Sequence, residues 1–378
     1  MTMNLVVVGA GVIGLSCAWR AAAAGHAVTV LDPAPASGAS WVAGGMLAPV
    51  TEAWPGEEHL LDLGVESVRR WPGFAADLTA AAGLPAGLRT EGTVVAATGA
   101  GDRAELDALA AYLTRLGRAV DRLSGRELRR LEPALGPDVR GGLSVPGDLA
   151  VDNRVLLAAL RAAGERVGVR FVERAAETVL DDGTRVTGVR LDGDVVETDA
   201  VLVSAGAHSA SLHPALDGLV RPVKGEILRL AHRTGAFPPP SRTVRALVDG
   251  RPVYAVPRDA GGLVVGATQA ETGFDTDVTV GGVRDLLRDA ERVLPGIAEY
   301  ALVESAAGLR PGSLDNLPLI GGLGPEGLLA ATGHGRNGML LAPVTADAVV
   351  ALLRGDAVPG QAKAADPGRF ATARTSRR

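Results

Sequence analysis

The segment that most constrains the fold of this chain covers residues 4–32, where two short apolar stretches flank a glycine-rich turn and a helix-like stretch. Residues 5–8 and 28–31 are almost all β-branched or leucine, which is typical of parallel strands covered on both faces. Between them, residues 9–14 read GAGVIG and lead into a segment with helical apolar spacing. The pattern predicts a βαβ unit whose glycine spacing suits a dinucleotide.

Each glycine of this turn has its own role in such a unit. Gly9 permits the tight turn, Gly11 lets the backbone approach a pyrophosphate, and Gly14 lets helix and sheet pack closely. The helix N-terminus then offers N–H groups and partial positive charge to the phosphates. Asp32 ends the second strand at a spacing suited to a ribose. Dinucleotide binding is favoured over a merely structural glycine turn, but the unit alone does not separate FAD from NAD.

Composition limits the class of protein further. Hydrophobic residues make up 47% and charged residues 21% of the 378 residues, which predicts a folded chain of about two domains. A net charge of -5 gives no global positive field for nucleic acid or an anionic membrane. Cys17 is the only cysteine, so no intrachain disulfide is possible and a reducing compartment, the cytoplasm, is expected. The sequence contains no run of about eighteen uninterrupted apolar residues, so no membrane span is expected.

The rest of the chain predicts an α/β protein with a second, antiparallel region. Residues 220–268 contain successive strands separated by proline and glycine turns, and a hairpin is expected across Asp181-Asp182-Gly183. Residues 356–378, rich in Ala, Pro, Gly and Arg, are expected to form a flexible tail. Further helices are expected at 57–82, 104–116, 153–167, 282–294 and 338–353, and further strands at 93–97, 169–172, 200–203 and 328–331.

Five separated segments follow one another in the order seen in a known family. They read SGASWVAGGMLAP, VYAVPR, GLVVGAT, GLRPGSLDNLPLIG and ATGHGRNGMLLAP. With the glycine turn, they resemble the D-amino acid oxidase family of FAD-dependent oxidoreductases, and within it the thiamine-pathway glycine oxidases. The resemblance covers nearly the whole chain, which makes it far more specific than one glycine loop.

The resemblance implies a discontinuous, Rossmann-like FAD-binding domain and a second α+β substrate domain built on an antiparallel sheet. We assign residues 1–85, 142–219 and 308–355 to the first domain, and 86–141 and 220–307 to the second. By similarity, the FAD site includes Gly9, Gly11, Val12, Ile13, Gly14, Asp32, Pro33, Ser40, Gly44, Gly45, Met46 and Ala176. The small residues of AGGML leave backbone N–H groups free to reach the flavin ring, whereas a flexible surface turn is the alternative for this loop.

A second glycine turn follows the strand expected at 328–331, and a helix is expected to start near Asn337. In the family this helix end faces the flavin, where backbone donors and the helix dipole favour the negative charge of the reduced ring. The resemblance therefore implies a second flavin contact formed by His334, Gly335, Arg336, Asn337, Gly338, Met339 and Leu340. An ordinary helix start is the alternative.

For the substrate, the resemblance points to Arg310, Tyr254 and Arg336. A guanidinium matches the geometry of a carboxylate, so Arg310 is expected to clamp the substrate carboxylate, with Tyr254 donating to the same group. Arg336 matches a further substrate-contacting arginine. The α-carbon would then face flavin N5 for hydride transfer, giving an imine that hydrolyses to an oxo acid and ammonia, while dioxygen becomes hydrogen peroxide. No side-chain base stands out in these motifs.

Several other residues are assigned structural roles. His208 and His334 lie in glycine-rich turns, where local hydrogen bonding is favoured over a role as base. No metal site is expected, because the remaining histidines show no ligand spacing with Cys17 or with each other. Cys17 is expected to be buried in the first helix, which argues against the covalent cysteine–flavin link of the related sarcosine oxidases and for non-covalent FAD. Gln269 replaces the apolar residue that family members often carry, which predicts a more polar pocket.

Two other functions remain open from the sequence. One keeps the fold but passes electrons to a carrier, as a D-amino acid or sarcosine dehydrogenase would. The other is a NAD-binding or non-catalytic nucleotide-sensing protein, against which the second glycine turn counts. Expected partners are a small amino acid such as glycine, sarcosine or D-alanine, dioxygen, and further copies of the chain in a dimer or tetramer.

Overall fold

A computed structural model describes residues 2–371. Its first large sheet has five parallel strands and one antiparallel edge strand, β19, which pairs with β20. Across the sheet the strands are β19 (Leu319–Gly322), β20 (Leu328–Thr332), β13 (Ala200–Val203), β1 (Asn4–Val8), β2 (Ala27–Leu31) and β9 (Arg170–Val172). The expected βαβ unit is therefore present, with β1 and β2 paired in parallel.

Side chains alternate along β1 and bury both faces of this sheet. Leu5 and Val7 pack into a core with four helices, whereas Val6 and Val8 pack against a small antiparallel sheet. The helices are α1 (Val12–Ala23), α3 (Glu58–Ala82), α6 (Asn153–Arg166) and α8 (Gly338–Arg354). The small sheet contains β10 (Ala176–Asp181), β11 (Val186–Leu191) and β12 (Asp194–Glu197), and it includes the expected hairpin.

The second large sheet has eight strands, all neighbours antiparallel except β15 and β5. Its order is β18 (Ala301–Ser313), β14 (Val220–Ala231), β17 (Gly262–Gly266), β16 (Arg251–Pro257), β15 (Thr243–Val248), β5 (Thr93–Ala97), β7 (Gly141–Val145) and β6 (Asp121–Ser124). The associated helices are α4 (Ala100–Arg115), α5 (Gly125–Leu131) and α7 (Val280–Val293). On β15 and β16, Val244, Ala246, Val253 and Ala255 belong to a core shared with α7, so the alternate residues face the other way.

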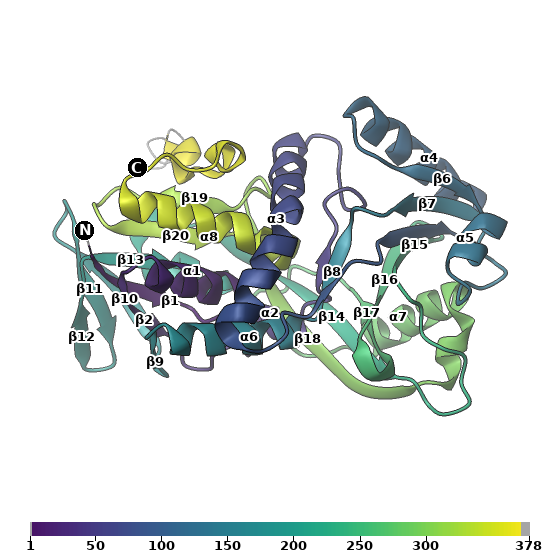
Figure 1. Cartoon of the computed structure of the whole chain (residues 1–378), viewed down its shortest axis with the longest axis horizontal. Helices are drawn as coiled ribbons and strands as arrows, with labels where there is room; N and C mark the ends of the chain where they lie inside the picture. The colour runs from purple at the N-terminus through teal and green to yellow at the C-terminus, as the bar shows by residue number, and fades with distance from the viewer. Residues whose placement is uncertain (1, 372–378) are drawn as a thin grey trace.

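Two long strands and one helix connect the two halves of the molecule. Figure 1 shows the two large sheets toward opposite ends of the long axis, with α3 and the β14–β18 pair between them. The β14–β18 ladder begins at Val220, which packs in the core of the six-stranded sheet, and continues to Leu228 and Leu230 in the core of the eight-stranded sheet. The remaining strands are β3 (Met46–Leu47), β8 (Leu149–Val151) and β4 (Leu88–Arg89), which form a three-stranded sheet, and the remaining α-helix is α2 (Ala39–Val42).

The elements expected from the sequence are present, with some shifted ends. Helix α4 begins at Ala100 instead of 104, because the Asp102 carboxylate accepts a hydrogen bond from the Gly99 N–H at 2.9 Å and caps the helix earlier. The two-domain division stays a proposal, with two changes. Residues 142–145 and 308–313, which we assigned to the first domain, lie in the eight-stranded sheet, where they pair with β5 and β14 as parts of β7 and β18.

The end of the chain differs from the expected flexible tail. Gly360–Ala365 and Pro367–Phe370 form short 3-10 helices, and Ala362 and Ala365 are buried in the helix-side core of the first sheet. Arg369 adds an ion pair to Asp315 at 2.8 Å. Small apolar side chains and this ion pair therefore anchor a segment whose composition alone suggested flexibility. Residues 372–378 of the predicted tail lie outside the described residues.

One segment of the described chain, Gly335–Arg354, is long and apolar enough to cross a membrane, with a mean hydropathy of 1.3 over its best window. This segment contains α8, whose side chains pack among α1 and α3, and 61% of the window is buried inside the fold. Its apolar character is thus accounted for by its place in the core.

Candidate active site

The first glycine turn has the geometry expected from its sequence. Gly9 adopts a φ of 106°, and a Cβ on it would lie 2.5 Å from the Ser204 carbonyl oxygen. A Cβ on Gly14 would collide with the Gly9 carbonyl oxygen, so only glycine allows α1 to approach the sheet this closely. Both glycines are therefore required by the fold itself, whatever binds beside them.

Two polar side chains hold the N-terminal end of α1 and its turn. The Asp32 carboxylate accepts hydrogen bonds from the N–H groups of Ala10 at 2.7 Å and Ala34 at 2.8 Å. The Ser40 hydroxyl oxygen accepts one from Val12 N–H at 3.0 Å. Asp32 and Ser40 thus satisfy orphan backbone donors, while both still line the cavity described next.

A single cavity of about 860 Å³ brings most of the predicted site residues together. It extends from the first glycine turn, past the loop before β3, to the face of the eight-stranded sheet and the start of α8. The predicted residues that line it are Gly9, Gly11, Val12, Ile13, Asp32, Pro33, Ser40, Gly44, Gly45, Met46, Ala176, Tyr254, His334, Gly335, Arg310, Arg336, Gly338 and Met339.

Three predicted residues do not line this cavity. Gly14 lies behind the turn, where it permits close packing. Asn337 and Leu340 line a smaller pocket next to it. The Leu340 carbonyl oxygen accepts hydrogen bonds from Ser67 Oγ at 2.6 Å and Trp71 Nε1 at 3.0 Å, which tie α8 to α3. These three positions support the walls of the cavity. Direct flavin contacts by any of the predicted residues remain a prediction.

A buried polar group behind the AGGML loop was not found by the sequence reasoning. Asn153, fully buried, donates to the carbonyl oxygens of Ser40 at 2.9 Å and Trp41 at 2.8 Å, and its Oδ1 accepts from Arg258 at 3.2 Å. The same guanidinium donates to the Gly44 carbonyl oxygen at 2.7 Å. Burial lowers the pKa of Arg258 to about 10, with Asp152 acting against this shift. The arrangement fixes the loop that faces the cavity; the only sequence signal was an arginine directly after VYAVP.

Tyr254 projects from β16 into the cavity between two glycines. A Cβ on Gly44 would lie 2.7 Å from the tyrosine ring, and one on Gly266 would collide with its hydroxyl. Desolvation raises the pKa of this hydroxyl, Glu52 adds to the rise, and Arg310 opposes it. Within the described chain the hydroxyl has no hydrogen-bond partner, so it is a protonated donor available to a ligand.

Arg310 lies half-buried on β18 and crosses over Gly225 of the neighbouring strand. A Cβ on Gly225 would collide with the guanidinium, so the glycine makes room for it. Arg310 Nη1 donates to the carbonyl oxygens of Thr268 at 3.2 Å and Lys224 at 3.4 Å. No carboxylate among residues 2–371 forms an ion pair with it. Its positive charge is therefore uncompensated and faces the cavity.

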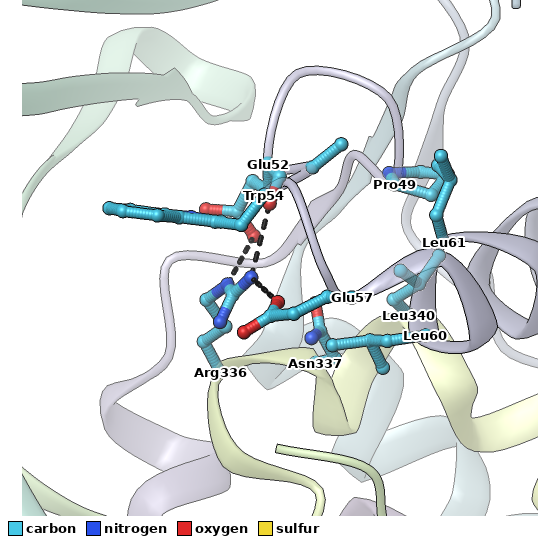
Figure 2. A pocket seen from close by; sticks show the side chains of 10 residues that line it. Pro49, Glu52, Trp54, Glu57, Leu60, Leu61, Arg336, Asn337 and Leu340 are labelled. Atoms are coloured by element: carbon cyan, nitrogen blue, oxygen red, sulfur yellow. Dashed lines mark hydrogen bonds and ion pairs between the residues drawn. The ribbon is translucent and has the colours of Figure 1, made fainter. Parts of the chain in front are cut away.

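Arg336 is in a different state, although it lines the same cavity. Its Nη2 forms an ion pair with Glu57 at 3.0 Å and donates to the Glu52 carbonyl oxygen at 3.1 Å, while its Nε lies 4.0 Å from the Glu52 carboxylate. Figure 2 shows this guanidinium facing Glu52 and Glu57, below Trp54. The structure thus ties Arg336 to the loop before α3 and does not present it as a free anion site.

The histidines and the cysteine have structural partners or surroundings. His334 is buried, and burial lowers its pKa to about 3, so the ring is neutral and interacts with Thr345 Oγ1 at 3.0 Å. His208 stacks on Phe274 with ring centroids 4.9 Å apart. Cys17 is fully buried in α1, and burial raises the pKa of its thiol. Among the described residues, no three His, Cys, Asp or Glu side chains form a group able to hold a metal ion.

Fold and cavity define a class of protein, a dinucleotide-dependent enzyme. One cavity is shared by the nucleotide fold, which is the six-stranded sheet with its helices, and by a cap, which is the eight-stranded sheet with its helices. The model of the family described as DAO, FAD dependent oxidoreductase, matches residues 4–352, and the chain belongs to this family. FAD is its cofactor. The residues present suit it, because the cavity joins the βαβ turn and Asp32, which suit a nucleotide, to a wall of small residues at Gly44 and Gly45.

Relatives of known name match over nearly the whole chain. Glycine oxidase of Geobacillus kaustophilus is 33% identical over 90% of both chains, and its crystal structure superposes with a TM-score of 0.88 over 97% of this chain and 98% of that one. Glycine oxidase of Pseudomonas putida is 34% identical over 94% of this chain and 95% of its own. The bifunctional protein ThiO/ThiG of Trichormus variabilis is 32% identical over 92% of this chain, which spans 52% of that protein. The chain thus spans about half the length of such bifunctional relatives.

Proposed function

We propose that this protein is an FAD-dependent oxidase that acts on glycine and other small amino acids. The observation that carries the proposal is that Arg310 and Tyr254 line the cavity shared with the first glycine turn. Among residues 2–371, the Arg310 guanidinium has no acidic partner and the Tyr254 hydroxyl has no hydrogen-bond partner. Relatives named glycine oxidase, aligned over 90% or more of both chains, support the same substrate class.

The binding step follows from these two side chains. Arg310 would accept the substrate carboxylate in two parallel N–H···O bonds, and Tyr254 would donate its hydroxyl to the same group. This anchoring fixes the α-carbon and the amine relative to the loop at Gly44 and Gly45, and such positioning supplies much of the rate acceleration. When bound there, FAD supplies the two-electron acceptor for the substrate C–H bond and passes the electrons to dioxygen.

Proton transfer would not depend on His334, although this histidine lines the cavity. His334 is neutral, because burial holds its pKa at about 3, and it is engaged with Thr345. The substrate would therefore react with its amine already unprotonated, and the activity should rise with pH as more of the free amine is present. The products would be an imine, which hydrolyses to an oxo acid and ammonia, and hydrogen peroxide.

The test is the visible spectrum of the purified protein before and after adding glycine without oxygen. Loss of the oxidised-flavin bands, their return in air and one equivalent of peroxide are expected. A flavin that glycine reduces but air does not reoxidise would favour a dehydrogenase instead. A flavin that no member of a panel of glycine, sarcosine and small D-amino acids reduces would contradict the proposal.

The biological setting is proposed on the names of relatives. The putative thiamine biosynthesis oxidoreductase ThiO of Rhizobium etli is 34% identical over 92% of this chain and 95% of its own length. We propose that glycine oxidation here supplies an imine for thiazole synthesis, in the cytoplasm. We also propose a homo-oligomer, dimer or tetramer, which a sedimentation measurement would test.

A further inference from the structure

Glu52 occupies an unusual place in the cavity. It belongs to the loop between β3 and α3 and lines both the large cavity and the smaller pocket beside it. Its carboxylate lies between two guanidinium groups, 3.5 Å from Arg245 Nη2 and 4.0 Å from Arg336 Nε. Arg245 also donates to the Thr51 carbonyl oxygen, and Figure 2 shows the other side of the arrangement, with Glu52 and Glu57 flanking Arg336.

The charges that line the cavity nearly cancel. Near the cap, the cavity has three cationic side chains, Arg245, Arg310 and Arg336, and one anionic one, Glu52. Glu57, outside the cavity, pairs with Arg336 as well. Two carboxylates therefore offset two arginines, and of the three arginines that line the cavity only Arg310 has no acidic partner among residues 2–371. Asp32 lies on the nucleotide side, where its oxygens accept backbone hydrogen bonds.

We propose that Glu52 restricts the cavity to substrates with a single carboxylate. The inference rests on the proposed function and adds a determinant of substrate class to it. A second carboxylate placed near Arg245 and Arg336 meets the Glu52 anion, whose side chain is only 13% exposed and is weakly screened. Without Glu52, Arg245 loses its acidic partner and can accept a second anionic group, while Arg336 keeps its ion pair with Glu57.

The experiment compares two inert ligands of similar size, propionate and malonate, by calorimetric titration of the FAD-loaded protein. For the natural chain, propionate is expected to bind more tightly than malonate. Glu52→Gln should tighten malonate binding by about tenfold and change propionate binding by less than about threefold, a difference set by one nearby charge. An unchanged ratio of the two affinities, or no malonate binding by Glu52→Gln, would overturn the proposal.

Two further variants separate charge from structural damage. Glu58→Gln removes the same charge from the same part of the chain. Glu58 lies outside both pockets and accepts hydrogen bonds from the Tyr112 hydroxyl and the Gly56 N–H. The ratio of the malonate and propionate affinities should therefore not change in this variant. Arg245→Met leaves Glu52 less compensated and should weaken malonate binding further. This second variant tests the proposal if Glu52→Gln fails to fold. Because these ligands are not oxidised, a protein inactive on glycine still gives an answer.

Discussion

Arg310 and Arg336 line the same cavity, yet among residues 2–371 the Arg310 guanidinium has no acidic partner and the Arg336 guanidinium has two. Arg336 forms ion pairs with Glu52 and Glu57 and so fastens the loop before α3 to the start of α8. Within the described residues, the half-buried Arg310 donates hydrogen bonds only to carbonyl oxygens. A partly buried charge without a counter-ion raises the free energy of the folded protein, so Arg310 is the arginine expected to bind an anionic group of a ligand. The difference shows that partners, and not residue type, decide which arginine can bind an anion.

The sharpest test of this contrast is Arg310→Met. Losing two charge-assisted hydrogen bonds to a carboxylate should lower kcat/KM for glycine by about a hundredfold to a thousandfold. Steady-state peroxide assays at matched flavin content measure it. Arg310→Lys keeps the positive charge but not the two parallel N–H donors of the guanidinium, so it should recover only part of the lost kcat/KM. A decrease in kcat/KM of less than about tenfold for Arg310→Met would contradict the inference that Arg310, and not Arg336, binds the substrate carboxylate.

Gly225→Ala should move Arg310 without changing any charge. The added methyl group would collide with the guanidinium, which must then shift. A displacement of this kind is expected to cost about tenfold to a hundredfold in kcat/KM. Because β14 keeps its hydrogen bonds, the melting temperature should change little. Gly235→Ala is the control. Gly235 has a φ of 90°, so alanine strains the backbone there, but its Cβ would lie in open space and would not touch Arg310. Equal activity losses in both variants would point to a general folding effect.

Tyr254→Phe removes one donor beside Arg310 and keeps the ring between Gly44 and Gly266. Losing a hydrogen bond to a carboxylate should raise KM for glycine by about tenfold, with a smaller effect on kcat. The cavity keeps its shape, so the visible spectrum should be unchanged. Substrate titrations of both proteins measure the effect. If kcat falls more than KM rises, the hydroxyl acts on the reaction and not on carboxylate binding.

Arg336→Met should have the smallest effect. Its ion pairs are partly exposed, with 30% of the arginine side chain and 19% of the Glu57 side chain accessible, and such pairs contribute at most about 1 kcal/mol. We expect about a threefold change in kcat/KM and a slightly lower melting temperature, both reproduced by Glu57→Gln. A loss as large as that of Arg310→Met would show that Arg336 contacts the substrate after all.

The features of this molecule that could be predicted from the sequence are those that depend on residues close together in the chain. The βαβ unit, α3 and the last core helix follow from apolar periodicity and glycine position, which depend on neighbouring residues. The state of Arg336 does not, since Glu52 and Glu57 lie on a loop far away in the sequence. The brace of Asn153 and Arg258 behind Gly44 likewise joins residues more than a hundred positions apart. Sequence spacing identified the wall of the cavity, whereas its electrostatics depended on tertiary contacts.

The β14–β18 ladder has a consequence for protein engineering. Its register runs unbroken from Val220 opposite Ser313 to Arg229 opposite Glu304, and it carries Arg310 on the stretch nearest the nucleotide fold. The strands, loops and helices of the outer cap are attached beyond this stretch. A chimera could take the outer cap from a relative and keep this stretch of the ladder, so that Arg310 stays in place. The range of accepted substrate side chains would then change, while the position of the substrate carboxylate would not.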